Sequence, residues 1–497
     1  MEDHREFYYD NDEYFNPKLN LNDSVLKEKV LNLIDVFRIP KSKIDSLQKR
    51  IINAIDSVLS NKDSSKNSEF LPLFNTLVTK YPNNQESGVF LGLDIGGTNL
   101  RIVLLNLKDS DESDRKIIID NYDVPVEFRQ STSEKFFDYL AGCLKNFYDK
   151  NQNILKDSPS RIPLGFSFSF CFEQLTINSG RCLQFSIATN LIDGIGKCPV
   201  QLFQKSIDSL QLPVEIVALA NDSTTTLICG KYFDPKTEIS LILGSGGNVA
   251  YVENVAADFR IENPREKFGL PLAPEKMIIN SEVFLFGDNH QIDDLKTCYD
   301  FELDAMSLLP GNYTLEKMIG GAFLGELFRM AILDLVRNRL ILNGKFTAFL
   351  VRPQSIPTAR MSSIDAEIIA NSNATALKRS FTEIDSMLIE CLDYQKQEID
   401  DDDRNIIAYL CQIISIRCAL ICSSILAAFI DRFDASKYPS IKICCDGSLY
   451  KKHPKMDRLI NGFLKAMVPQ QQQQCQIFPV DNGSSVGAAL LAACYRN

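Results

Sequence analysis

The sequence predicts an α/β protein with more than one domain. Short apolar runs that read as strands alternate with stretches of helical periodicity, an order typical of α/β folds. The chain has 497 residues, about three times the ~150 residues expected of one domain, so two or three hydrophobic cores are expected. Apolar residues make up 45% and charged residues 24%, which excludes a wholly disordered chain.

The first half of the chain contains helices, a linker and then strands. Residues 22–60 carry apolar side chains at three- and four-residue steps, which predicts two amphipathic helices separated at Pro40. The polar run 60–68 predicts a linker. Apolar runs then predict strands at 89–95, 100–107, 116–128 and 162–170, with a helix at 133–148 between the last two.

The second half begins with strands and becomes mostly helical. Polar runs at 400–403 and 470–474 are expected to be solvated loops. Apolar runs predict strands at 214–222, 239–244, 249–254 and 441–448, and helical patterns cover 314–342, 381–395, 404–433 and 484–496.

Residues 406–430 are almost wholly apolar and long enough to span a bilayer. Arg417 lies at the middle of this run, where an arginine costs about 2.5–3.5 kcal/mol of insertion free energy. Gln412 and the acidic residues before the run add to that cost. We therefore expect a buried core helix and no membrane span.

Charge and cysteine content limit the partners and the compartment. With 53 basic and 64 acidic residues the net charge is -11, which would repel phosphate backbones, so no nucleic acid partner is expected. Fourteen cysteines show no paired spacing, and the three histidines do not cluster with them, so neither disulfides nor a zinc site are expected. The acidic, aromatic N-terminal sequence lacks an export signal. We expect a cytoplasmic protein, either a monomer or a homodimer.

Two glycine-rich loops follow apolar strands, at Asp94–Arg101 and Gly244–Asn248. Paired glycines let the backbone turn tightly and present N–H groups, so either loop could cradle phosphate; a plain hairpin turn remains the alternative. The sequence pattern of a P-loop is absent from the chain. The strand–Asp–Gly pattern at 92–99 returns at 444–449 and suggests two similar halves, although such turns are common.

Asp222 follows an apolar strand directly and stands beside Asn221. A carboxylate at the end of a buried strand is partly desolvated and can be tuned as a base. The simpler reading is that Asp222 only caps the helix that follows.

At these residues the order of motifs resembles the hexokinase family, within the larger group of actin-like, two-lobed sugar kinases. The motifs that carry the resemblance are VFLGLDIGGTNLR, LGFSFSF, ALANDS, LILGSGGNVAYVE, NSEVFLFGD, LLPGNYTLEKMIGGAFLGELFR, CCDGSLYKKHP and DNGSSVGAALLAA, over about residues 70–497. The resemblance implies a two-lobed actin-like ATPase (ribonuclease H-like) fold, with mixed central sheets, flanking helices and a cleft between the lobes. It places a small lobe at 70–217 together with the C-terminal helix 484–497, a large lobe at 218–483, and a helical extension at 1–69 on the large lobe.

The resemblance also implies an activity: transfer of the terminal phosphate of Mg-ATP to the 6-hydroxyl of a hexose, with glucose expected, as the first step of glycolysis. Asp222 matches the residue that accepts the hydroxyl proton, and sugar binding is expected to close the cleft. The implied sugar contacts are Ser169, Phe170, Ser186, Asn221, Asp222, Asn248, Glu282 and Glu316.

On the nucleotide side, magnesium is expected to be held by ATP rather than by a protein cage, because it dehydrates reluctantly. The implied ATP contacts are Asp94, Gly96, Gly97, Thr98, Asn99, Arg101, Gly244, Ser245, Gly246, Gly447, Ser448, Lys451, Gly483 and Ser484.

The sequence departs from the family pattern near the sugar. Ile187 stands where the family has a lysine, and losing such a cation beside the transferring group costs on the order of 10²–10³ in rate. Lys197 is a nearby lysine that could replace it. Cys171 and Val283 are further departures, from a proline and a tryptophan. A catalytically weak, sugar-binding sensor or regulator is therefore the alternative function, and an actin- or chaperone-like ATPase is a third.

Overall fold

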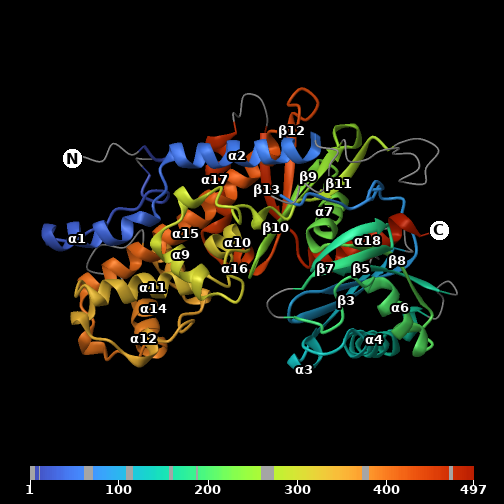
Figure 1. Cartoon of the computed structure of the whole chain (residues 1–497), viewed down its shortest axis with the longest axis horizontal. Helices are drawn as coiled ribbons and strands as arrows, with labels where there is room; N and C mark the ends of the chain where they lie inside the picture. Colours follow the sequence, from blue (N-terminus) through green and yellow to red (C-terminus); the bar gives the residue numbers. More distant parts are fainter. Residues whose placement is uncertain are drawn as a thin grey trace.

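The computed structural model describes residues 6–9, 12–60, 71–107, 116–155, 161–185, 189–258, 274–371, 380–468 and 474–496. Two mixed β-sheets lie in separate parts of an elongated molecule, each with helices packed on its faces (Figure 1). This architecture confirms the predicted α/β class.

The first sheet has five strands in the order β4-β3-β2-β5-β8. Its strands are β2 (Val89–Ile95), β3 (Asn99–Asn106), β4 (Lys116–Asp123), β5 (Ile162–Phe168) and β8 (Val214–Ala220). The expected strand at 116–128 is too long: Pro125, which cannot donate to a ladder, precedes the short helix α3 (Val126–Arg129).

The second sheet has six strands in the order β1-β11-β10-β9-β12-β13. They are β1 (Phe74–Asn75), β9 (Thr237–Leu243), β10 (Gly247–Asn254), β11 (Lys276–Asn280), β12 (Ser440–Asp446) and β13 (Gln474–Pro479). Gln474, expected in a loop, opens β13, while 469–473 lie outside the described residues. A separate hairpin pairs β6 (Cys171–Thr176) with β7 (Ser179–Gln184).

Five strands of each sheet follow the same pattern. Strands β4, β3 and β2 are antiparallel neighbours and β2, β5 and β8 are parallel; β11, β10, β9, β12 and β13 repeat this series. The two halves suggested by the sequence are therefore present. The match between residues 92–99 and residues 444–449 was wrong, however. In the structure the β2–β3 turn corresponds to the β9–β10 turn and not to the end of β12.

Helices α7 (Asp222–Phe233) and α18 (Gly483–Tyr495) pack against each other between the two sheets (Figure 1). Helix α18 reaches the strands at backbone distance, because a Cβ on Gly92 would lie 2.2 Å from the Ser485 carbonyl oxygen and one on Gly165 would lie 1.8 Å from that of Ala488. On the outer face of the five-stranded sheet lie α4 (Ser133–Lys150) and α6 (Pro199–Ser209).

Helix α15 (Asp401–Ile430) is the core helix of the six-stranded half. In the part of the chain that the structure describes, it is the one helix long and apolar enough to cross a membrane, and 94% of its apolar window is buried in the protein. Arg417 pairs with Asp300 at 2.6 Å, and both side chains are buried. The prediction of a buried core helix is thus confirmed.

The acidic run 400–403 is a helix start and not the loop that we expected. Asp400 is the N-cap of α15, and its carboxylate and that of Asp403 each accept a hydrogen bond from the other residue's backbone N–H. Negative charge is stabilised there by the N–H groups of the first helical turn.

The two predicted N-terminal helices are present as α1 (Ser24–Ile34) and α2 (Lys41–Ser60), and α2 packs on α15. The linker predicted after Ser60 lies outside the described residues. The remaining helices are α5 (Gln152–Leu155), α9 (Cys298–Met306), α12 (Ala348–Val351), α13 (Thr358–Asn371), α16 (Ser448–Lys452) and α17 (Met456–Met467).

Two predicted helices are interrupted. The pattern at 314–342 is split into α10 (Thr314–Ile319) and α11 (Leu324–Arg337), and the pattern at 381–395 forms α14 (Thr382–Ser386) followed by one π-helical turn. The first break occurs because Gly321 donates its N–H to the Gly244 carbonyl instead of continuing the helix.

The predicted lobe limits remain a prediction, with one observation against the limit at residue 70. Strand β1 lies inside the range expected for the small lobe, yet it pairs with β11 of the six-stranded sheet. Helix α18, at the other end of the chain, covers the five-stranded sheet as expected for the small lobe.

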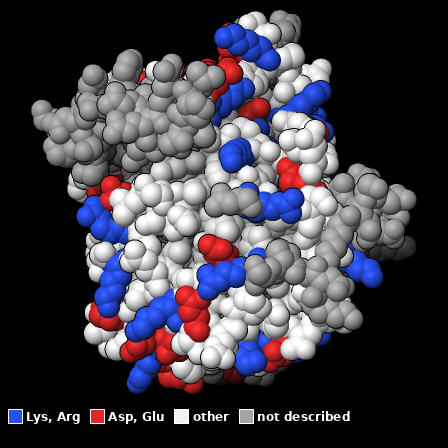
Figure 2. Space-filling view, turned by 90° about the vertical axis from the view of Figure 1, so that its right-hand side faces the viewer, with Lys and Arg blue, Asp and Glu red and all other residues white. Residues whose placement is uncertain are grey.

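Charges of both signs are intermixed on the described surface beside the five-stranded sheet (Figure 2). One ion pair there lies within α4, Lys145–Asp149, and two join neighbouring elements, Arg161–Asp208 and Lys205–Glu134. This face therefore carries no single-sign field that would attract a polyanion.

Candidate functional site

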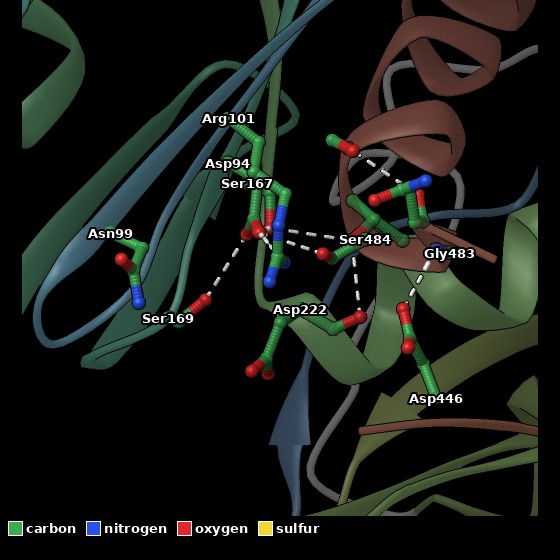
Figure 3. Close-up of polar contacts among 12 residues, drawn as sticks. Asp94, Asn99, Arg101, Ser167, Ser169, Asp222, Asp446, Gly483 and Ser484 are labelled. Carbon is green, nitrogen blue, oxygen red and sulfur yellow. Dashed lines mark hydrogen bonds and ion pairs between the residues drawn. The ribbon is translucent and has the colours of Figure 1, made fainter. Parts of the chain in front are cut away.

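Asp94, the sixth residue of β2, is the centre of a dense set of polar contacts. Its carboxylate is buried and receives hydroxyl hydrogen bonds at 2.8 Å from Ser167, 3.3 Å from Ser169 and 2.7 Å from Ser484. Arg101, opposite Asp94 on β3, pairs with the same carboxylate at 3.2 Å. Figure 3 shows these four side chains converging on Asp94, while Asn99 stands apart at the β2–β3 turn.

The start of α18 joins the two halves of the molecule. Ser484 donates to Asp94 at the end of β2, and the Gly483 backbone N–H donates to Asp446 at the end of β12, at 2.7 Å (Figure 3). The other Asp446 oxygen accepts from the Gly447 N–H and pairs with Lys451 at 2.7 Å. Two strand-end carboxylates, one from each sheet, are therefore held by consecutive residues of one helix.

Both glycine-rich loops are tight hairpin turns. The Gly96 N–H donates to the Asn99 carbonyl, and the Gly244 N–H donates to the Gly246 carbonyl. A Cβ on Gly246 would lie 2.3 Å from a carboxylate oxygen of Glu316, so a side chain there would displace that carboxylate. Gly447, with φ of 116°, lies next to Gly244 and closes the second turn from the side.

Asp222 is the first residue of α7, and Asn221 is the N-cap, with its side chain accepting from the Ser223 N–H at 3.0 Å. The half-buried Asp222 carboxylate accepts from the same N–H at 2.8 Å and from the Ser169 hydroxyl, which also contacts Asp94. Burial, then the charges of Asp94 and Glu282, raise the pKa of Asp222 to about 7. Asn221 does the capping, which leaves Asp222 available as a base.

Beside Asp222 lies a cluster of three amides and one carboxylate from three elements. Asn248 of β10 donates to Asn221, to Asn280 of β11 and to Glu282, at 3.3, 2.8 and 3.1 Å. Asn280 donates to the same Glu282 oxygen at 2.9 Å. Within the described residues, the other oxygen of Glu282 has no recorded donor. The cluster therefore presents a fixed, half-satisfied carboxylate next to Asp222.

Glu316, on α10, is the third carboxylate of this group. It accepts a single recorded hydrogen bond within the described residues, from the Gly247 N–H at 3.2 Å. Burial is the main reason that the pKa of Glu316 is raised to about 7, and burial likewise raises the pKa of Glu282. All three side chains are half-buried and could accept hydrogen bonds from a ligand that carries hydroxyl groups.

Several expected residues are placed differently or cannot be placed. The ring of Phe170 packs on Phe168 and Phe185, with centroids 4.8 and 5.3 Å away, so it belongs to the core. Lys197 pairs with Asp193 at 2.6 Å and does not stand in for the missing lysine. Ser186 and Ile187 lie outside the described residues.

The remaining nucleotide-side residues lie at the two loops and α16. Gly97 accepts a hydrogen bond from Thr189 through its carbonyl oxygen. The side chains expected to meet ATP and found exposed are Thr98, Asn99, Ser245, Ser448 and Lys451, whereas Gly483 and Ser484 are buried. The Ser484 hydroxyl therefore donates its hydrogen bond to Asp94 in this structure.

The sequence analysis missed Asn280, Ser167 and Asp446. Asn280 stands two residues before Glu282, and Ser167 two residues before Ser169, a spacing that places each pair on one side of an extended strand. That period of two was a usable signal. Asp446 was seen only as part of the repeated Asp–Gly pattern.

Metal ligands of protein origin are few. Among the described residues there is no group of three or more His, Cys, Asp or Glu side chains that could hold a metal ion. Both Asp94 oxygens and both Asp446 oxygens are already engaged by donors. This donor set fits a magnesium ion that arrives bound to phosphates.

Comparisons with known proteins agree with this geometry. Two family models, both described as hexokinase, match residues 29–232 and 238–494. The hexokinase of Kluyveromyces lactis is 30% identical over 473 residues, which cover 94% of this chain and 92% of that protein. Human hexokinase-1 is 27% identical over 92% of this chain, and the match spans 47% of that protein. The hexokinase of Schistosoma mansoni, solved with glucose, superposes with a TM-score of 0.83 at 26% identity, over 95% of this chain and 100% of that one.

Proposed function

This chain belongs to the hexokinase family, and we propose that it transfers the terminal phosphate of Mg-ATP to the 6-hydroxyl of a hexose, with glucose as the first candidate, in the first step of glycolysis. The fold is the two-lobed α/β fold of that family.

The observation that carries the proposal is the raised pKa of Asp222 together with the fixed position of its carboxylate. A general base works best when its pKa lies near the working pH, and burial with two neighbouring carboxylates raises the pKa of Asp222 to about 7. The N-terminal position on α7 fixes the half-buried carboxylate, which lies near Ser169 (Figure 3). The hexose 6-hydroxyl would donate its proton to Asp222 as its oxygen attacks the terminal phosphorus of ATP, and ADP would leave.

The sugar would be held mainly by carboxylates that keep open acceptor positions. Glu282 and Glu316 can each accept hydroxyl hydrogen bonds, and Asn221 and Asn248 supply amide groups beside them. A site built to bond particular hydroxyls rejects analogues that lack them, because its buried groups would then stay unpaired.

The phosphates would lie along the two glycine hairpins, where backbone N–H groups can approach without a Cβ in the way. Arg101 lies beside the first hairpin with 37% of its side chain exposed, and Lys451 lies beside the second. Magnesium bound to ATP would neutralise charge on the transferring phosphate. Closure of the two lobes over the sugar would exclude water and protect ATP from hydrolysis.

We also propose a cytoplasmic location and a monomer or homodimer. All fourteen cysteines are free thiols, which supports a reducing compartment.

The test is a coupled assay of ADP release with glucose, fructose or mannose, together with thermal shift for each sugar. We expect sugar-dependent ADP release, and stabilisation by about 2.7 kcal/mol at a sugar concentration of about 100 Kd. Sugar binding without ADP release would favour the sensor or regulator suggested by Ile187. ATP hydrolysis that does not depend on sugar would favour a simple ATPase.

A further inference from the structure

A buried polar cluster includes the residues that directly follow α16, the helix that contains the expected nucleotide contacts Ser448 and Lys451. Asp365, on α13, is fully buried, and its carboxylate pairs with Lys455 at 2.6 Å and with His453 at 3.3 Å. Ser415 of α15 donates to the same carboxylate at 2.7 Å and lies 3.2 Å from the His453 ring nitrogen. Burial raises the pKa of Asp365, but Lys455 and His453 outweigh burial and lower it to about 2.

The cluster fixes the chain directly after α16. His453 and Lys455 are both buried, and the Lys455 backbone N–H donates to the His453 ring. The Lys455 ammonium also donates to Gln412 of α15, at 3.2 Å. Helix α16 spans five residues, so a fixed residue 453 leaves Gly447 and Lys451 little freedom to move.

The other end of α13 reaches the second glycine hairpin. The Thr358 hydroxyl donates to the Gly321 carbonyl at 2.6 Å, and the Gly321 N–H donates to the Gly244 carbonyl at 2.9 Å. Gly244 in turn lies against Gly447. Helix α13 is thus bonded to the segment beyond α16 and linked through Gly321 to the hairpin, the two parts between which the nucleotide would lie.

We propose that Asp365 is a positioning residue for the nucleotide. Through Lys455 and His453 it holds α16 at a set distance from the Gly244–Gly246 hairpin, and Thr358 on the same helix holds the hairpin. This inference rests on the proposed function for the identity of the ligand. The inference adds Asp365 as a residue that touches neither substrate and selectively controls nucleotide affinity.

The matched control is a buried ion pair of which one member lies on α15. Asp300 pairs with Arg417 of α15 at 2.6 Å, and both side chains are at most 3% exposed, yet the recorded contacts of this pair do not include the hairpin or α16. Asp300→Asn should therefore lower stability as Asp365→Asn does, because each leaves a buried cation short of its partner.

The experiment measures ADP binding by calorimetry, glucose binding by thermal shift, and KM for both substrates in the full chain. Asp365→Asn should weaken ADP binding and raise KM for ATP by ~10-fold, since small misplacements of a binding group are costly. Glucose binding should stay within ~2-fold of the wild type. Asp300→Asn should leave both affinities within ~2-fold.

Equal loss of ADP and glucose affinity in Asp365→Asn, no loss of either, or the same loss in Asp300→Asn would overturn the inference. If Asp365→Asn does not fold, Ser415→Ala is the second variant, because it removes only one hydrogen bond to Asp365. Ser415→Ala should weaken ADP binding by ~3-fold. Unchanged ADP binding in Ser415→Ala would also overturn the inference. ADP binding needs no turnover, so a wild type that binds ADP without phosphorylating sugar would contradict the proposed function alone. A wild type that does not bind ADP would overturn both.

Discussion

The carboxylates on the two sides of the site differ in how many hydrogen-bond donors they receive. On the nucleotide side, Asp94 has three hydroxyl donors and an arginine, and Asp446 has two backbone N–H donors and a lysine. On the sugar side, Asp222 has the Ser223 backbone N–H and the Ser169 hydroxyl, and Glu316 has one recorded donor among the described residues, a backbone N–H.

This difference separates structural carboxylates from reactive ones. A carboxylate with three or four donors is held rigid, and it has few lone pairs left for a ligand. A half-buried carboxylate with one or two donors has a raised pKa here and open acceptor positions, which is the condition required for a base or a hydroxyl acceptor.

The largest effect should come from removing the base. Asp222→Asn should lower kcat by at least ~10²-fold, because the hexose hydroxyl loses its proton acceptor. ADP affinity should hardly change. Asp234→Asn at the other end of α7 is the control, since Asp234 is exposed to solvent and pairs with Lys442. Near-normal turnover in Asp222→Asn would show that Asp222 only starts the helix.

A smaller effect should come from Asn280, which orients the sugar-side carboxylate without lying at its open face. Asn280→Ala should raise KM for the hexose by ~10-fold through lost hydrogen bonds to Glu282 and from Asn248, with KM for ATP unchanged. Asn461→Ala, which loses hydrogen bonds within α17 and one from Ile477 of β13, is the control for stability alone. A rise in KM for ATP equal to that for the hexose would contradict this role.

The smallest effect should appear in stability against pH. Because the pKa values of Asp222 and Glu316 are raised to about 7 from 3.8 and 4.5, the folded protein holds these protons more tightly than the unfolded chain does. Their contribution to stability is present below pH ~4 and is lost as the pH rises through ~7. Asp222→Asn and Glu316→Gln, which stay neutral, should therefore gain a few degrees in Tm over the wild type near pH ~8, and less near pH ~4. An equal gain at both pH values would contradict the assigned ionisation.

Local chemistry made part of the site predictable. Asp222 could be identified because an acid directly follows an apolar strand, and the glycine hairpins because paired glycines stand between strands. Long apolar runs located most strands of both sheets, whereas the shorter β1, β11 and β13 were not predicted.

The rest depended on contacts between distant parts of the chain. Ser484 bonds to Asp94 across 390 positions, and no local pattern signals that a serine at a helix start will meet a strand in the other half. The acidic run 400–403 was misread because its composition suits a loop as well as it suits a helix N-terminus. The break after α10 was missed because Gly321 bonds to a hairpin far away in sequence.

The place of α18 has a consequence for the order in which the protein can assemble on the ribosome. Strands β2 and β5 are synthesised early, but the helix that covers them and fills the space against Gly92 and Gly165 follows all the other described elements in the sequence. Until residues 483–496 emerge, the apolar surface of these strands has no native cover. The emerging chain must therefore rely on chaperones or temporary contacts to protect that surface from aggregation.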